Sequence, residues 1–334
     1  MTAAVGAEPM RFAVEPWSPD YGVPADDAAL APTTAQVDIE VERPTRDWAP
    51  IVPASAATVE SIVFVDGVRR VDASVWIETP AGPRQGLCAS YAAGAVHSRG
   101  GRCSIVAIEA ARGLFARAEG AETINTRHGK YPIRAVAGDA PSDLILGVQR
   151  SMNSLEVKVA SAAGDTDLIV VDGPLGSHVR SAAGPAGRPP LIGYIKTHKV
   201  AYLPASVAGV VADLPAGART PLFVASSPLG PRYSWYLRLP SRPGHSWVGI
   251  VRCEAGADQT VTDAAALANR ATVTLVRFAS SEHKDPRAPQ NLYPIGGLER
   301  ELRHRLGDRE LLVRALIREG TGVPSRALPA MTQL

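Results

Sequence analysis

Two apolar runs that each end in Asp-Gly are the features that most constrain how this chain folds. The first run, residues 61–65, leads into Asp66 and Gly67, and strand-like alternation resumes at 71–77. Because β-forming residues fill the run and glycine permits a tight turn, the pattern predicts a hairpin with Asp66 at its mouth. The second run, residues 168–171, leads into Asp172 and Gly173. A continuous apolar run is typical of a strand buried on both faces in the middle of a sheet.

These two strands each deliver a carboxylate, Asp66 and Asp172, to what we expect to be neighbouring strand ends. Mg²⁺ and Mn²⁺ prefer hard oxygen ligands and bind weakly to a lone carboxylate. The pair therefore predicts a divalent-metal site. With a glutamate from a helix, two aspartates can hold two ions about 4 Å apart, the arrangement used for in-line phosphoryl displacement.

Two glutamates are candidates for the third acid. Glu109 directly follows a strand predicted at 102–108. Glu156 lies in a helix predicted from residue 141, on the edge of its apolar stripe, where an uncompensated carboxylate is costly to desolvate. The stripe has spacings of four, four, three and four and consists of Leu144, Val148, Met152, Leu155 and Val159. The residues alone leave the choice between the two glutamates open.

The rest of the chain predicts an α/β fold, a mixed sheet flanked by helices. Further strands are expected at 85–96, 191–196, 221–225, 235–239 and 247–254, and helices at 264–278, 297–306 and 308–319. Strand-end acids on a mixed sheet that begins with a hairpin are the RNase H-like arrangement. The Gly, Ala and Pro-rich stretch 173–190 is expected to be a loop.

Residues 1–50 are rich in Pro, Ala and acids and show no sustained period, which favours an extended arm ahead of a domain at 51–334. The arm carries the aromatic residues Trp17, Tyr21 and Trp48. It either lies over the domain through these side chains or docks a partner.

Composition limits the function classes. The chain has 334 residues, with 35 Lys and Arg against 33 Asp and Glu, so no global basic field announces nucleic-acid binding, and phosphate contacts must come from local patches. Candidates are Lys196 at a strand end and an arginine-rich surface on the last two helices. Three widely spaced cysteines disfavour a zinc site or a disulfide framework and favour a reducing cytoplasm.

Five short motifs together resemble the NurA nuclease family, whose RNase H-like members act with the HerA translocase in processing DNA ends. They extend over residues 60–306 and read Phe64-Val65-Asp66-Gly67, Leu155-Glu156, Leu168-Ile169-Val170-Val171-Asp172-Gly173-Pro174-Leu175, Gly193-Tyr194-Ile195-Lys196 and Leu292-Tyr293-Pro294-Ile295. The third motif, with its Pro-Leu tail, is the most specific.

The resemblance implies a set of site residues. Asp66, Glu156 and Asp172 become ligands of two divalent ions, Mn²⁺ in preference to Mg²⁺, because the family places its glutamate on the helix just before the second Asp-Gly strand. Tyr293 lines the same site, and His304, at a loose spacing, stands for a family histidine in the following helix. Lys196 and Arg252 are the candidates for contacting DNA phosphates.

The leading hypothesis is a metal-dependent DNA nuclease of end processing and repair, a 5′ to 3′ exonuclease with endonuclease activity on single strands. The resemblance further implies a homodimer docked on a hexameric HerA-type ATPase. The alternative is a non-catalytic adaptor that guides DNA or docks the translocase, although the presence of all three acids argues against a decayed site. An enzyme acting on RNA is a third hypothesis, since recognition of the 2′-OH leaves no short signature.

Overall fold

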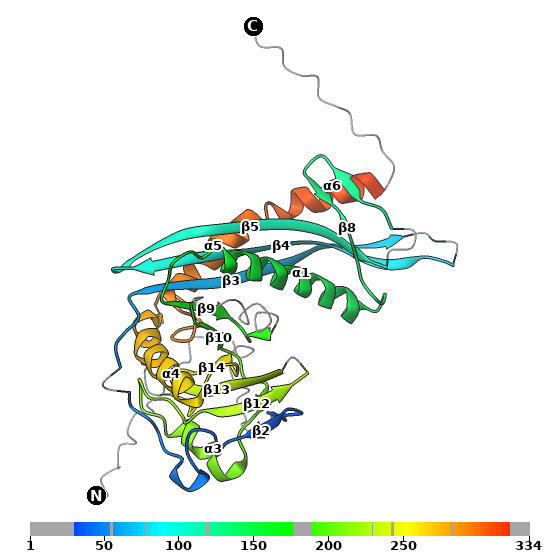
Figure 1. The fold of residues 1–334 in the computed structure, drawn as a ribbon. Coiled ribbons are helices and arrows are strands. Elements are labelled where there is room, and N and C mark those ends of the chain that lie inside the picture. Colours follow the sequence, from blue (N-terminus) through cyan, green and yellow to red (C-terminus); the bar gives the residue numbers. More distant parts are fainter. Residues whose placement is uncertain are drawn as a thin grey trace, which may run out of the picture.

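One long mixed sheet, with helices on both sides, organises the molecule (Figure 1). The computed structural model describes residues 30–53, 56–77, 79, 81–117, 121–176, 189–228, 230–241, 244–281 and 283–320. The strands are β1 (Ala31–Pro32), β2 (Gln36–Asp38), β3 (Ser61–Ile77), β4 (Arg84–Arg99), β5 (Arg102–Ala116), β6 (Ile124–Thr126), β7 (Gly129–Tyr131), β8 (Ile133–Ala135), β9 (Leu168–Asp172), β10 (Leu191–Ile195), β11 (Val200–Ala201), β12 (Phe223–Ser227), β13 (Gly230–Arg238) and β14 (Ile250–Gly256). The helices are α1 (Pro141–Ser161), α3 (Ala205–Ala212), α4 (Val261–Leu275), α5 (Tyr293–Arg305) and α6 (Arg309–Gly320), with short 3₁₀ turns η2 (Thr45–Asp47) and η4 (Val276–Phe278).

The strand order confirms the predicted fold class. Within the order β2-β12-β13-β14-β10-β9-β3-β4-β5-β8, the strands β3, β4 and β5 form an antiparallel meander. β9 pairs parallel to β3, and β10 pairs parallel to β9. The segment β5-β4-β3-β9-β10 is the RNase H-like arrangement, and β14, β13, β12 and β2 extend it as antiparallel neighbours.

The predicted turn at Gly67 is wrong, because β3 runs without interruption through residues 61–77. Gly67 pairs with Ala93 in the middle of the β3–β4 ladder, and its backbone does not adopt the left-handed conformation. The chain reverses only after Ile77, which pairs with Arg84. Asp66 therefore lies inside a strand, at the level where the neighbouring strand β9 ends.

Helices cover the two faces of the β3–β4–β5 meander differently. α1 lies across one face and α5 and α6 across the other, as Figure 1 shows. The apolar stripe predicted for α1 is largely buried, with Leu144, Val148, Met152 and Val159 turned inward. α5 begins at Tyr293 and not at the expected residue 297, because Pro294 fits the first turn of a helix, where its missing N–H is not needed.

The second half of the predicted N-terminal arm packs on the sheet. β2 pairs with β12 and forms one edge of the sheet, and the buried Trp48 donates a hydrogen bond from Nε1 to the Ile39 carbonyl at 2.8 Å. Glu42 accepts two hydrogen bonds from the guanidinium of the buried Arg219. Trp17 and Tyr21 lie outside the described residues, as does most of the loop predicted at 173–190.

No helix in the described ranges is long and apolar enough to cross a membrane.

Candidate active site

Asp66 and Asp172 lie side by side on adjacent strands. Val65 of β3 pairs with Val171 of β9, and each aspartate is the next residue along its strand. Because side chains alternate across a strand, both carboxylates point to the same face of the sheet, the face covered by α5. The sequence prediction that these two acids come together is therefore confirmed by the strand register, although Asp66 is not at a strand end.

Both carboxylates are poorly compensated. Asp66 is 5% exposed, its Oδ1 accepts a hydrogen bond from the Gly67 N–H at 2.7 Å, and its Oδ2 is buried without a hydrogen-bond partner. Burial, and then the negative charge of Asp172, raise the pKa of Asp66 well above its usual range. Burial also raises the pKa of Asp172, although Lys196 opposes the shift. The two carboxylates thus lie in a buried region where negative charge exceeds the positive charge that could balance it.

Glu156 reaches this region from α1, on the opposite face of the sheet. Its side chain is buried, and its charge acts on Asp66. A β carbon at Gly67 would lie 2.5 Å from Oε1 of Glu156 and 2.9 Å from Cγ of Met152. The glycine is required because the glutamate occupies the space that any larger residue would fill.

Glu109, the competing candidate, lies elsewhere. It belongs to the interior of β5, so the strand does not end at residue 108 as predicted. Its carboxylate forms an ion pair with Lys158 of α1 at 2.6 Å, and its side chain is 39% exposed. The structure therefore favours Glu156 over Glu109 as the neighbour of Asp66.

Lys196 forms an ion pair with Asp172 just beyond the end of β10. Its ammonium group also donates a hydrogen bond to Oδ1 of Asn291 at 3.0 Å, and Asn291 donates to Oδ2 of Asp285 at 2.6 Å. This chain of contacts ties the sheet to the loop before α5. The side chain of Lys196 is 10% exposed, so the lysine is part of the site and not a surface cation.

Sequence analysis did not select Glu299 and Arg287, which complete the charged cluster. Glu299 accepts a hydrogen bond from Arg287 at 2.9 Å in a two-pronged ion pair, and its charge acts on Asp66 and Asp172. Burial favours a raised pKa for Glu299, but the hydrogen bond and charge of Arg287 outweigh burial and lower it. Glu299 is thus held as an anion beside the aspartates.

A sequence signal for Glu299 did exist. The buried residues Ile295, Leu298 and Leu302 form the apolar stripe of α5, and Glu299 lies at its edge. This is the same pattern that singled out Glu156 on α1. Nothing local marks Arg287, whose role depends on a contact twelve residues away.

A groove of about 450 Å³ opens beside this cluster. Tyr293 is in its wall, 41% exposed, with its hydroxyl 2.6 Å from Oγ of Ser281 and the Lys284 ammonium 5.2 Å from its ring centre. The lining residues are Ser280, Lys284, Asp285, Pro286, Arg287, Tyr293, Gly296, Gly297, Glu299, Arg300 and Arg303. The groove therefore combines several cations with the carboxylates of Asp285 and Glu299.

Two expected site residues lie apart from the aspartates. His304 is exposed in the last turn of α5, five residues after Glu299 and so about 140° around the helix. Arg252, the other candidate for contacting DNA phosphates, is only 5% exposed. Its guanidinium pairs with Glu254 at 2.7 Å and lies 4.2 Å from the ring centre of Tyr202.

The chemistry of the donors fits a divalent cation. Asp66 and Asp172 offer hard oxygen ligands on one face of the sheet, and Oδ2 of Asp66 is buried with no partner, whereas Glu156 lies across the sheet at Gly67. A cation would also offset the charge that raises the pKa of both aspartates. In the described ranges no three His, Cys, Asp or Glu side chains already converge on one ion position. The Lys196 ammonium holds Asp172 instead, so binding an ion requires these side chains to rearrange.

Fold and site together define an RNase H-like sheet with a buried acidic centre at the junction of β3 and β9. Among solved structures, the chain is similar to the NurA nuclease from Sulfolobus solfataricus, at 12% identity over 84% of this chain and 89% of that one, with a TM-score of 0.46. It is also similar to Endonuclease V from Bacillus subtilis (13% identity, 81% and 86% covered, TM-score 0.34) and to the catalytic domain of human Endonuclease V (15%, 89% and 93%, 0.31). No family model and no curated protein matches the sequence. Likenesses of this degree do not specify an activity.

Proposed function

We propose that the protein is a metal-dependent nuclease that hydrolyses phosphodiester bonds of DNA at the Asp66–Asp172 centre. The observation that carries the proposal is the pair itself, two adjacent buried carboxylates whose pKa values are both raised. Such a pair costs folding free energy, and strongly perturbed acids of this kind concentrate at functional sites.

The residues of the site divide into holding and positioning roles. Asp66 and Asp172, which face the same side of the sheet, would hold the cation, which when bound activates water and stabilises the leaving oxygen. Glu156, across the sheet at Gly67, is the third ligand that the family resemblance implies. Lys196 and Asn291 fix the orientation of Asp172 through their hydrogen bonds. Arg287 keeps Glu299 ionised at the mouth of the groove.

The groove supplies a path for the substrate. Lys284, Arg300 and Arg303 line it together with Tyr293, and a strand of DNA lying there would meet cations along its phosphates and reach Glu299, whose charge acts on both aspartates. Tyr293, in the wall of the groove, would contact the nucleotide next to the scissile bond. Arg252, which is buried and paired, has no part in this path.

The finer features of the proposal come from the family resemblance. They are two ions with Mn²⁺ preferred over Mg²⁺, 5′ to 3′ exonuclease and single-strand endonuclease activity in DNA end processing, a homodimer, and a HerA-type hexameric ATPase as partner. Each is a proposal separate from the hydrolysis itself.

The decisive experiment is cleavage of end-labelled single- and double-stranded DNA with Mn²⁺, Mg²⁺ or EDTA, using the wild type and Asp172→Asn. The control is Glu109→Gln, which removes an acid that pairs with Lys158 of α1 and lies outside the cluster. We expect cleavage that depends on the metal, is lost in Asp172→Asn and is kept in Glu109→Gln. The product ladder then gives the polarity.

Two results would overturn the proposal. One is full activity in Asp172→Asn. The other is no cleavage by the wild type, even with a HerA-type ATPase present, which would favour the adaptor hypothesis. Repeating the assay on RNA of the same sequence decides between the two nucleic acids.

A further inference from the structure

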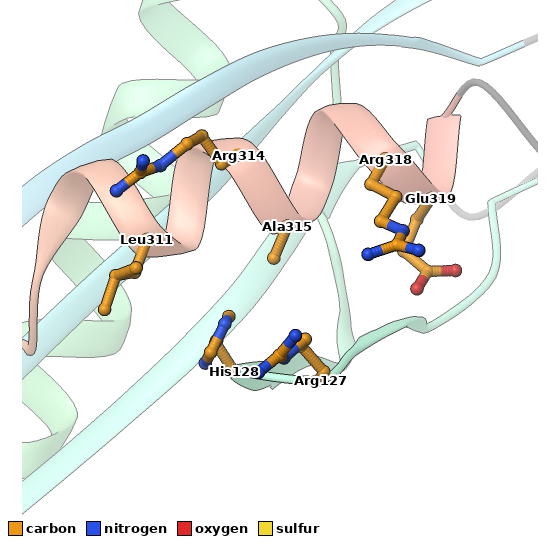
Figure 2. Close-up of a pocket in the computed structure, with 7 residues that line it drawn as sticks. All are labelled: Arg127, His128, Leu311, Arg314, Ala315, Arg318 and Glu319. Carbon is orange, nitrogen blue, oxygen red and sulfur yellow. The ribbon is translucent and has the colours of Figure 1, made fainter. Parts of the chain in front are cut away.

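A second pocket, of about 350 Å³, lies away from the acidic centre, between α6 and the β6–β7 hairpin (Figure 2). Its lining residues are Arg127, His128, Leu311, Arg314, Ala315, Arg318 and Glu319. Three of these seven are arginines and one is an acid, so the pocket has a net positive charge without counting the histidine.

The two walls of this pocket have different characters. Arg127 and His128 form the tip of the hairpin, and Arg314 and Arg318, one helical turn apart, project from α6. Leu311, which is 41% exposed, and Ala315 form an apolar surface on the side of α6 that lines the pocket. A cationic rim around an apolar surface offers both a phosphate contact and a place for a base to pack.

The hairpin that carries one wall is firmly anchored. Thr126 Oγ1 accepts hydrogen bonds from the N–H groups of His128 at 3.2 Å and Gly129 at 3.0 Å, which fixes the turn. Behind it, the hydroxyl of the buried Tyr131 donates to Oδ2 of the buried Asp72 in β3 at 3.0 Å. The pocket is therefore preformed, and binding there does not have to order its wall.

We propose that this pocket binds one nucleotide of a single nucleic-acid strand, with the phosphate at the arginines and the base against Leu311 and Ala315. Its volume is near the lower end of the range for ligand pockets, roughly 300–1,000 Å³, which suits a single nucleotide and not a duplex. The proposal rests on the proposed function in taking the ligand to be the same nucleic acid that the acidic centre cleaves.

The test is the binding of a fluorescent 20-nucleotide DNA single strand in EDTA, where no metal-dependent cleavage occurs, measured by anisotropy over a series of salt concentrations. Arg127→Ala/Arg314→Ala removes one arginine from each wall. Arg43→Ala/Arg99→Ala removes two exposed arginines outside the pocket and outside the last two helices, and is the charge-matched control. Losing two phosphate contacts makes the slope of log affinity against log salt shallower by about 1.4.

We expect the pocket variant to bind more weakly with this shallower slope, and the control to keep a slope close to that of the wild type. Equal slopes in both variants would overturn the proposal. So would competition by polyglutamate as effective as that by unlabelled DNA, because the pocket would then respond to charge alone. Cleavage with Mn²⁺ is assayed separately, so a binding defect without nuclease activity would retain the pocket and reject the nuclease.

Discussion

Gly67, in the middle of β3, faces the carboxylate of Glu156, which comes from α1. The carboxylate fills the space that a side chain at residue 67 would take. The β carbon that an alanine would add at residue 67 falls 2.5 Å from Oε1 of Glu156. The position of this carboxylate beside Asp66 therefore depends on the absence of a side chain in the neighbouring strand.

Gly67→Ala should displace Glu156 and lower both stability and cleavage. Crowding a packed site in this way costs about 1–3 kcal/mol. Thermal unfolding and the cleavage assay measure the two effects. Gly209→Ala is the control, since it lies in α3 with open space around it and should be neutral or stabilising. Wild-type activity and melting temperature in Gly67→Ala would show that Glu156 has no role at this position.

Asp66→Asn should abolish cleavage and at the same time raise the melting temperature by a few degrees. The amide removes a buried charge that neighbouring acids repel, so the folded state gains stability while the candidate ligand is lost. Mn²⁺ should raise the melting temperature of the wild type but not of the variant. A less stable Asp66→Asn protein would contradict the description of this carboxylate as uncompensated.

The stability difference between Asp66→Asn and the wild type should depend on pH. A carboxyl whose pKa is raised in the folded state contributes stability at low pH and loses it as the pH rises from about 4, its unfolded value, through the folded value. The melting temperatures of the two proteins should therefore converge as the pH falls toward 4. A constant difference across the series would contradict this.

Glu299→Gln should reduce cleavage at least about tenfold, a typical loss for a group that supports a catalytic centre. Arg287 would lose one of its two carboxylate partners and keep Asp285, and the negative charge beside Asp66 and Asp172 would fall. Glu301→Gln is the matched control, because Glu301 is on the same helix but pairs with Arg305. If the two variants have equal activity, Glu299 is not part of the site.

Because of His198, the free energy of unfolding should decrease as the pH falls from about 6.5 to about 4. Burial lowers the pKa of His198 to about 4, so the unfolded chain takes up a proton that the folded protein does not. The loss approaches about 1.4 kcal/mol per pH unit in this window. Unfolding curves of His198→Gln should lack this component, whereas those of the exposed His245→Gln should retain it.

Sequence was informative wherever one element carries its own signal. The apolar run before Asp172 predicted β9, and the stripe of α1 predicted both the helix and the partial burial of Glu156. The sequence prediction failed at Gly67. An Asp-Gly dipeptide looks the same whether the glycine turns the chain or makes room for a distant side chain, here that of Glu156.

The contacts of Arg252 and Arg287 could not be predicted from sequence for a related reason. The alternating pattern of β14 does not reveal that Tyr202, from a distant segment, covers Arg252. Arg287 lies in a loop, where no periodicity indicates which way its side chain points, and its link to the aspartates passes through Glu299 on another element. Such contacts are set by packing between elements.

Because β3 runs as one strand, it sets the spacing between two parts of the protein. Asp66 and Asp72 lie six residues apart on this strand, at most about 20 Å at about 3.4 Å per residue, because the β3–β4 register shifts at Asp72. The first belongs to the acidic centre, and the second anchors the β6–β7 hairpin through Tyr131. A turn at Gly67 would have made this spacing adjustable, whereas a continuous strand makes it constant. A nucleic acid held at both places would be cut at a set distance from its held end.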